Sequence, residues 1–368
     1  MFQAVRIQGF RGLRDFSMEN LGRINLLVGK NNCGKSSVLE GLELLSSRGG
    51  VRTLWNATVR RGERFWVEGD GARYSEGDVS RIFYGHRIDY DSHIEISART
   101  SSNEESVGIS VFRRTTDQMA LFEDTTRPPL EPEEEMNLQI QWCNGRPKSV
   151  VEIPLSPRGG ISSRNIMRRQ GDVSDLPAIR FISTAALSIE EVLALFDEVV
   201  LTPEESFLVD ALKTIEPSIE RIASIGADRS RFPNSRQGGI VVKTSQFQER
   251  VPIGSMGDGM WRLLGIAVSL VNAENGVLLV DEIDTGLHYS VLGNMWRLVQ
   301  ETAERLNVQV FATTHSRDCY ESLAEISRDY VSENSKVTIQ RIEVGSERAV
   351  AFTEQEIVAA SRRGIEVR

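Results

Sequence analysis

The stretch GKNNCGKS at Gly29–Ser36 fits the phosphate-loop pattern G-x-x-x-x-G-K-[ST] at every fixed position. The apolar run Ile24–Val28 before it predicts a short buried strand, and residues 36–47 after it carry apolar side chains at helical spacing. Strand, glycine loop and helix follow one another in the order that the pattern requires. The stretch therefore predicts an α/β fold that cradles a triphosphate.

The residue types in this loop suit phosphate chemistry. Gly29 and Gly34 let the backbone curl so that its N–H groups point inward, and the following helix adds a partial positive charge at its N-terminus. Lys35 is long enough to reach the outer phosphates. An ordinary glycine-rich turn would not need the Lys-Ser pair. The residues expected to bind the nucleotide here are Gly29, Asn31, Asn32, Cys33, Gly34, Lys35, Ser36 and Ser37.

A second apolar run, Val277–Val280, ends in two carboxylates, Asp281 and Glu282. Such a run is typical of a central parallel strand, whose carboxyl end is where open α/β sheets place their ligands. We expect Asp281 and the Ser36 hydroxyl to hold Mg²⁺, and Glu282 to orient or deprotonate the attacking water. An isolated Asp-Glu pair would more simply cap a helix, but the phosphate loop favours the hydrolytic interpretation.

The next apolar run, residues 308–312, is followed by Thr313-Thr314-His315-Ser316. A neutral histidine at a strand end can donate a hydrogen bond to a γ-phosphate, or contact the water and the catalytic carboxylate. His315 is therefore predicted to sense the γ-phosphate. The predicted catalytic residues are Glu282, His315 and Lys35.

Composition restricts the remaining function classes. The 368 residues suffice for two domains or for one domain with a large insertion, and the net charge of −9 argues against a basic surface over the whole molecule. Three cysteines, Cys33, Cys143 and Cys319, are widely spaced, which disfavours a disulfide framework or a zinc site. The N-terminus lacks a signal-peptide core and no apolar run approaches membrane-spanning length, so we expect a cytoplasmic protein without a membrane partner.

The chain divides into three parts on this evidence. Residues 1–90 are expected to form an N-terminal ATPase lobe, 91–175 an antiparallel β-rich insertion with a flexible loop, and 176–368 a C-terminal ATPase lobe. The middle part alternates polar and apolar residues in short segments, which indicates an antiparallel sheet. In the last part, residues 190–201 and 203–224 are predicted to be helices.

Three further stretches leave alternatives open. In residues 48–72, arginines interleave with Trp55, Phe65 and Trp66, a pattern that binds single-stranded nucleic acid or, as we prefer, forms a helix pair with the aromatic residues in the core. Residues 158–170 are predicted to be either a mobile phosphate-binding loop or a surface connection. The acidic residues 131–135 are expected to be a solvated loop.

Taken together, the motifs resemble an ABC-type ATPase head of the SMC/RecF/OLD group, particularly the small bacterial AAA proteins related to the overcoming-lysogenization-defect family. The motifs occur in the order found in that family. They are the phosphate loop, Ser255-x-Gly257 before a helix, Asp281-Glu282, residues 284–288 and His315. The resemblance implies that residues 255–259 form the signature loop and 284–288 the D-loop. It adds Ser255, Gly257 and Gly259 to the nucleotide-binding residues.

The signature loop departs from the family pattern. It contains Ser-Met-Gly-Asp-Gly in place of Leu-Ser-Gly-Gly-Gln, so only Ser255 and Gly257 correspond directly, and residues 183–188 offer no Q-loop glutamine. Its glycines before a helix nevertheless form a second anion-binding end, while the first phosphate site is already surrounded by Lys35 and Mg²⁺. The loop is best used across an interface, which predicts a head-to-tail homodimer with two ATP molecules between the protomers.

The resemblance implies an ABC-type P-loop ATPase head with a mixed central sheet and an antiparallel β subdomain. The expected function is Mg²⁺-dependent ATP hydrolysis, with ATP-driven dimerisation acting as a switch on DNA or on an effector protein, in antiphage defence or DNA maintenance. The alternative is a slowly hydrolysing scaffold that holds and releases a toxin or nuclease. The chain after His315 is too short for an appended nuclease domain. Transport and long-armed tethering are disfavoured.

Overall fold

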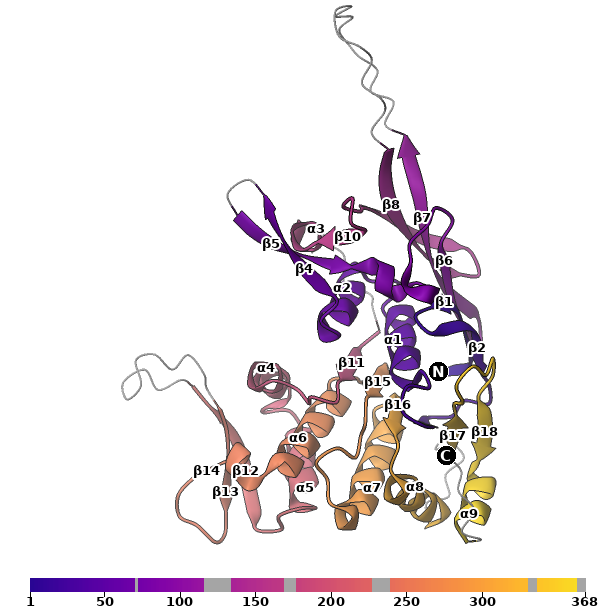
Figure 1. Cartoon of the computed structure of the whole chain (residues 1–368). Helices are drawn as coiled ribbons and strands as arrows, with labels where there is room; N and C mark the ends of the chain where they lie inside the picture. The colour runs from indigo at the N-terminus through magenta and orange to yellow at the C-terminus, as the bar shows by residue number, and fades with distance from the viewer. Residues whose placement is uncertain (70–71, 116–133, 169–176, 227–238, 330–335, 363–368) are drawn as a thin grey trace, which may run out of the picture. The chain divides into compact units, whose positions relative to one another are not determined.

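The computed structural model describes residues 1–69, 72–115, 134–168, 177–226, 239–329 and 336–362 (Figure 1). The chain forms two compact units, each described below by itself. Unit 1 contains Met1, Met18–Leu39 and Pro177–Arg368, and unit 2 contains Phe2–Ser17 and Glu40–Leu176. Both units are therefore assembled from segments that are far apart in the sequence.

Unit 1 is built on a mixed sheet, which confirms the expected α/β class. Within the described residues its six strands lie in the order β11-β15-β16-β3-β17-β18. The first five run parallel to their neighbours, and β18 is antiparallel to β17. The strands are β11 (Ile179–Ile182), β15 (Val277–Val280), β16 (Gln309–Thr314), β3 (Ile24–Val28), β17 (Val337–Arg341) and β18 (Val350–Thr353). Strands β3, β15 and β16 are buried throughout, as their continuous apolar runs predict.

Helices pack on this sheet and bury one continuous apolar core. Helix α6 packs against α4, α5 and α7, and α8 packs against α7 and α9. Trp296 of α7 and Tyr320 of α8 are among the largest fully buried side chains. The helices of this unit are α4 (Ile189–Val199), α5 (Glu205–Lys213), α6 (Asp258–Val271), α7 (Tyr289–Arg305), α8 (Arg317–Asp329), α9 (Glu354–Arg362) and the short η3 (Ile253–Met256).

The helix predicted over residues 203–224 is wrong in its second half. Helix α5 ends at Lys213, and the chain then forms strand β12 (Ile219–Ile225), which pairs with β13 (Gly239–Thr244). Strand β13 in turn pairs with β14 (Val251–Pro252). Pro217 explains the break, because proline cannot continue a helix and moves the preceding residue out of helical geometry.

Unit 2 contains the predicted antiparallel sheet. Its strand order among the described residues is β2-β1-β6-β7-β8-β9, and the pairs from β1 to β9 are antiparallel. The two N-terminal strands therefore join the same sheet as the middle of the chain. The strands are β1 (Phe2–Phe10), β2 (Leu13–Met18), β6 (His93–Thr100), β7 (Glu104–Thr115), β8 (Glu134–Asn144) and β9 (Pro147–Pro154). Helix α1 (Lys35–Ser46) begins in unit 1 and ends in unit 2.

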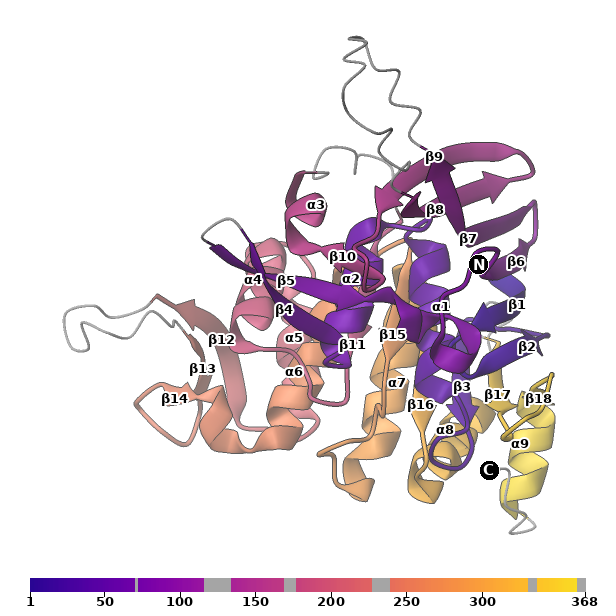
Figure 2. The same cartoon turned by 45° about the horizontal axis from the view of Figure 1, so that its top comes forward.

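The helix pair predicted for residues 48–72 is also wrong. Among the described residues of this stretch only α2 (Val51–Arg60) is helical. The chain then turns at Gly62, whose φ is 70°, into a hairpin of β4 (Arg64–Gly69) and β5 (Ala72–Asp78) (Figure 2). Strand β10 (Gly160–Ser162) extends this hairpin to a three-stranded sheet, followed by α3 (Ser163–Arg168), with η1 (Val79–Ile82) and η2 (Tyr84–His86) after β5. The stretch predicted as a loop over 158–170 thus holds a strand and a helix up to residue 168, and residues 169–170 and 131–133 lie outside the described residues.

Candidate active site

Three neighbouring parallel strands of unit 1 bring the predicted site residues to one edge. Strand β16 lies between β15 and β3, with Val280 paired to Ala312 and Thr314 paired to Val28. Strands β15, β16 and β3 lie side by side (Figure 2). The phosphate loop follows β3, Asp281 and Glu282 follow β15, and His315 follows β16. The carboxyl ends of adjacent parallel strands meet at one sheet edge, so the site is assembled by the strand order itself.

The phosphate loop has the tight curl that its glycines allow. Gly29 has a φ of 147° and Gly34 one of 102°. A Cβ on Gly29 would lie 2.3 Å from the Ile342 carbonyl oxygen and 2.9 Å from the Cys33 sulfur. Helix α1 then begins at Lys35, and the amide of Val38 donates to the Gly34 carbonyl at 2.9 Å. A side chain at position 29 would therefore clash with Ile342, the residue after β17, and with Cys33 of the loop itself.

Lys35 is buried within the loop. Its ammonium group donates to the carbonyl oxygens of Gly29 at 2.8 Å and Lys30 at 2.9 Å, and lies 3.9 Å from the Cys33 sulfur. Asn31 and Asn32 are exposed, whereas Cys33 and Ser37 are buried. The Lys35 ammonium group is thus held inside the curl of the loop by two of the loop's own carbonyl oxygens.

Ser36 and Asp281 meet as expected. The Ser36 hydroxyl donates to Asp281 Oδ2 at 2.9 Å, although the two residues are 245 positions apart. A hydroxyl and a carboxylate are hard oxygen donors of the kind that Mg²⁺ prefers. Within the described residues no three His, Cys, Asp or Glu side chains are grouped to hold a metal by themselves. This donor set fits a magnesium ion that takes its remaining ligands from phosphate and water.

Glu282 and His315 are also neighbours. His315 Nδ1 lies 3.6 Å from Glu282 Oε1, and the Thr285 hydroxyl donates to Glu282 Oε2 at 3.3 Å. The Glu282 side chain is 34% exposed and that of His315 is 54% exposed, so both remain open to an incoming substrate. The two groups predicted to act on the water and on the γ-phosphate therefore face the same region.

Thr313 is a site residue that the sequence reasoning missed. Its hydroxyl donates to Asp281 Oδ1 at 2.6 Å and accepts the backbone N–H of Glu282 at 2.8 Å. Thr313 is fully buried at the end of β16. The signal was present, since Thr313 lies two positions before His315 in the strand-end segment, but the role of its hydroxyl depends on the neighbouring strand.

Arg262 of α6 was missed as well. Its guanidinium donates to the carbonyl oxygens of Ser183 at 2.7 Å, Asp281 at 2.7 Å and Glu282 at 2.8 Å. Only 3% of the residue is exposed, and this burial lowers the pKa of Arg262. The sequence signal for Arg262 was its positive charge among the apolar residues of an amphipathic helix. Ser183 opens the segment in which no Q-loop glutamine was found, so that segment reaches the site through its backbone.

The signature loop lies at the start of α6. Ser255 and Gly257 are exposed, and Gly257 has a φ of 100°. A Cβ on Gly259 would lie 2.7 Å from the Gly286 carbonyl oxygen, so the start of α6 packs closely on the segment 284–288. That segment is anchored by Asp284, whose carboxylate accepts from the Thr314 hydroxyl at 2.7 Å. The structure therefore joins the predicted signature loop to the predicted D-loop of the same chain.

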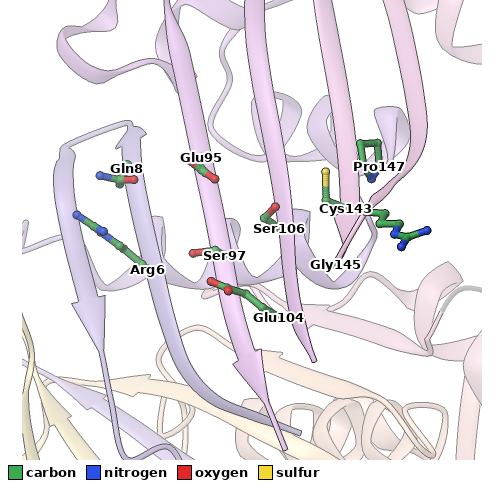
Figure 3. A pocket seen from close by; sticks show the side chains of 10 residues that line it. Arg6, Gln8, Glu95, Ser97, Glu104, Ser106, Cys143, Gly145 and Pro147 are labelled. Atoms are coloured by element: carbon green, nitrogen blue, oxygen red, sulfur yellow. The ribbon is translucent and has the colours of Figure 1, made fainter. Parts of the chain in front are cut away.

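Unit 2 has a separate depression of about 420 Å³ on the open face of its antiparallel sheet. Figure 3 shows side chains from β1, β6, β7 and β8 around it, among them Arg6, Glu95, Glu104 and Cys143. Arg6 donates to Asp15 at 2.9 and 2.6 Å, and this hydrogen bonding lowers the pKa of Asp15. Charges of both signs line the depression, and none of the predicted nucleotide-binding residues does.

No helix of the described residues combines the length and apolar character that crossing a bilayer demands. This result agrees with the absence of long apolar runs in the sequence.

Comparisons with protein families agree with the site. Residues 1–109 match the family described as "AAA ATPase domain", and residues 170–318 match the family described as "AAA domain, putative AbiEii toxin, Type IV TA system". The first match contains the phosphate loop, and the second contains the signature loop, Asp281, Glu282 and His315.

Individual proteins also match the chain in sequence. The chain is 23% identical over 357 residues to an ATP/GTP phosphatase of Helicobacter pylori, covering 89% of both chains. It is 51% identical over 89 residues to the uncharacterized protein MJECL10 of Methanocaldococcus jannaschii, covering 36% of that protein. It is 27% identical over 85 residues to the DNA replication and repair protein RecF of Clostridioides difficile, covering 23% of each.

Solved structures show the fold. An SMC head bound to the C-winged helix domain of ScpA matches with a TM-score of 0.52 at 14% identity, covering 96% of this chain and 98% of the other. An SMC head with an extended coiled coil, bound to the C-terminal domain of ScpA derived from Pyrococcus furiosus, also gives 0.52, at 11% identity and 98% coverage of both. In its fold, its motifs and its family matches the chain is similar to the SMC/RecF/OLD-like ABC-type ATPases.

Proposed function

We propose that the chain is a Mg²⁺-dependent ATP hydrolase whose ATP-driven, head-to-tail homodimerisation acts as a switch. The observation that carries the proposal is the junction of Ser36, Asp281, Glu282 and His315 at the ends of three adjacent strands. Hydrolysis by the H. pylori relative named a phosphatase supports the same chemistry. We further propose that the protein acts in the cytoplasm.

In this proposal the chain's own groups divide the work. Lys35 and the loop amides bind the β- and γ-phosphates, while Glu282 orients the attacking water and accepts its proton. His315 donates to the γ-phosphate and so reports its presence. Ser36 and Asp281 would hold Mg²⁺, which would neutralise charge that develops on the phosphate oxygens.

The exposed signature loop supports the dimer. Ser255 and Gly257 face solvent at the start of a 14-residue helix, whose N-terminus favours anions. Because one phosphate cradle is already complete, we assign this second one to the ATP bound by the partner protomer, with Ser255, Gly257 and Gly259 as its contacts. ATP then joins two chains by touching both, and hydrolysis loosens them.

The load of the switch is DNA or an effector protein. The RecF relative is named for DNA replication and repair, and one matching family is described by a toxin–antitoxin system. These names favour DNA maintenance or antiphage defence as the setting. The alternative is a slowly hydrolysing scaffold that holds and releases a toxin or nuclease.

Three variants test the switch by light scattering and ATP turnover. Glu282→Gln should bind ATP and accumulate as a dimer while hydrolysis falls about 10²- to 10⁴-fold, the usual contribution of a general base. Lys35→Ala should lose ATP binding and remain monomeric. Ser255→Arg should bind ATP as a monomer, because its bulk and charge fill only the second cradle. Normal hydrolysis by Glu282→Gln, or an ATP-induced dimer of Ser255→Arg, contradicts the proposal.

A further inference from the structure

The β4–β5 hairpin of unit 2 exposes an aromatic side chain that was expected in the core. Trp66 is 53% exposed, whereas the helix pair predicted from the sequence would have buried it. Phe65 and Tyr74 of the same hairpin are half-buried. A single exposed aromatic ring is common on protein surfaces, so the side chains that surround Trp66 decide whether it marks a binding site.

Arginines surround these rings. The guanidinium carbons of Arg64 and Arg73 lie 6.0 and 5.2 Å from the centroid of Trp66. Arg158 lies 6.0 Å from the centroid of Phe65, and Arg164 lies 4.5 Å from that of Tyr74. All four arginines are exposed. They come from three separate segments, so the grouping is a property of the folded sheet and not of one basic run.

The strand register sorts these residues onto two faces. Trp66 is opposite Ser75, and Arg73 is opposite Glu68, so Arg64, Trp66 and Arg73 share one face of the hairpin. Val67 is opposite Tyr74, which places Phe65 and Tyr74 on the other face. Each face therefore offers an aromatic ring flanked by guanidinium groups, and Glu68 is the exposed carboxylate beside Trp66.

The charge of this surface is opposite to that of the chain. The whole chain carries −9, and nearby arginines at the end of α2 are neutralised, since Arg60 pairs with Glu43 and Arg61 pairs with Glu40. Within the described part of the chain, the four arginines around the rings form no ion pair with a carboxylate. The hairpin is thus a local cationic surface on an acidic protein, complementary to a polyanion.

We propose that the β4–β5 hairpin, with Arg158 and Arg164, binds single-stranded nucleic acid. Unpaired bases can stack on Trp66 and Tyr74, while the guanidinium groups contact the phosphates. A duplex keeps its bases stacked inside and cannot offer them to an exposed ring. The inference rests on the proposed function in one respect: it identifies single-stranded nucleic acid as the molecule on which the ATP-driven switch acts. Binding of nucleic acid by the hairpin itself is a separate property of unit 2.

The test is fluorescence anisotropy of a labelled 20-nucleotide oligo(dT) with the full chain. Trp66→Ala should weaken binding about 10-fold, within the range of one stacked base, and Trp66→Phe should restore most of the affinity. The matched control is Phe247→Ala, which removes another aromatic side chain that is 60% exposed, from unit 1. Because position 66 is exposed, thermal unfolding should be unchanged in these variants.

Charge reversal tests the phosphate contacts. Arg64→Glu with Arg73→Glu should weaken binding and reduce the slope of log affinity against log salt by about 0.7 for each lost contact. Arg221→Glu on β12, an exposed arginine of unit 1, is the control and should change neither.

Three results would overturn the inference. The first is that Trp66→Ala and Phe247→Ala bind the oligonucleotide with equal affinity. The second is that a duplex binds as tightly as the single strand. The third is that the hairpin retains a protein partner that no oligonucleotide displaces. The oligonucleotide-binding result can be distinguished from a failure of the proposed ATP-driven dimerisation. Trp66→Ala should still dimerise with ATP, and failure of the wild-type chain to dimerise would leave Trp66-dependent oligonucleotide binding intact.

Discussion

The Thr313 hydroxyl donates to the Asp281 carboxylate at 2.6 Å and, through the same oxygen, accepts the backbone N–H of Glu282 at 2.8 Å. One buried hydroxyl therefore fixes both the proposed metal ligand and the proposed base. Glu282 has a φ of 49°, in the left-handed region that costs a non-glycine residue about 1–3 kcal/mol. Contacts on both sides of this residue hold it there: Thr313 at its N–H, and Arg262 at its carbonyl oxygen.

Replacing Thr313 by valine should therefore lower turnover without lowering ATP affinity. Valine keeps the shape of the side chain but supplies neither hydrogen bond, so Asp281 and the backbone of Glu282 both lose a partner. A misplacement of about 1 Å costs up to about 10²-fold in rate, and we expect a decrease of kcat by about 10- to 100-fold. Thr313→Ser keeps the hydroxyl and should retain most of the activity, as measured by steady-state hydrolysis and by binding of labelled ATP.

Thr338→Val is the matched control for this substitution. Thr338 lies on β17 of the same sheet, is 1% exposed, and its hydroxyl donates to Asn25 Oδ1 at 2.9 Å, remote from the strand ends that carry the site. It should lose a similar amount of stability, about 1 kcal/mol, and keep its kcat. A similar loss of kcat in both valine variants would mean that Thr313 acts only through stability.

Arg262→Met should reduce both stability and kcat. The substitution removes the donor from three carbonyl oxygens at once, and each buried group left unsatisfied costs about 1–3 kcal/mol. Arg262→Lys supplies an ammonium group but not the planar fork, so it should restore folding more fully than turnover. Thermal unfolding and steady-state kinetics separate the two effects. A folded Arg262→Met with wild-type kcat would remove Arg262 from the positioning of Glu282.

The parts of the fold that were predictable carry a strong local signal. Continuous apolar runs such as Ile24–Val28 and Val277–Val280 form the buried parallel strands, and alternating segments form the antiparallel sheet. The errors arose where local patterns competed. In residues 203–224 apolar spacing favoured a helix, but Pro217 ended it, and in residues 48–72 Gly62 allowed a turn into a hairpin that composition alone did not distinguish from a second helix.

The site followed the same rule. The positions of Lys35, Asp281 and His315 could be predicted because each ends or follows a recognisable strand, and strand ends meet. The role of the Thr313 hydroxyl and the contacts of Arg262 could not be assigned in this way, because both depend on side chains and carbonyl groups of neighbouring elements. Arg262 is 19 and 20 positions from the carbonyl groups of Asp281 and Glu282, and 79 from that of Ser183, so its role exists only once α6 packs on the sheet.

Glu43 should give unit 2 a measurable pH dependence. Burial raises the pKa of Glu43 above its ordinary value of 4.5, although its partner Arg60 opposes the shift. The folded chain therefore binds this proton more tightly than the unfolded chain, and stability from this group is present below pH 4.5 and is lost as pH rises through the folded pKa. Glu43→Gln should lack that loss, so its unfolding temperature relative to wild type should rise as the pH is raised above 4.5. A difference that stays constant as the pH is raised from 4.5 would contradict the assignment.

Removing either proposed magnesium ligand should change the metal requirement of hydrolysis more than it changes the fold. Ser36→Ala and Asp281→Asn each withdraw one oxygen donor from the pair joined at 2.9 Å. The Mg²⁺ concentration for half-maximal turnover should rise about 10-fold or more, since groups that merely orient metal ligands already contribute 10- to 100-fold to affinity.

Asp318→Asn, which removes an exposed carboxylate at the start of α8, is the charge control and should leave the Mg²⁺ titration unchanged. Because excess Mg²⁺ should restore turnover to Ser36→Ala before it does so for Asp281→Asn, which loses the charged ligand, the order of rescue distinguishes metal binding from general damage to the site. Identical titrations in wild type and both variants would require the metal ligands to lie elsewhere.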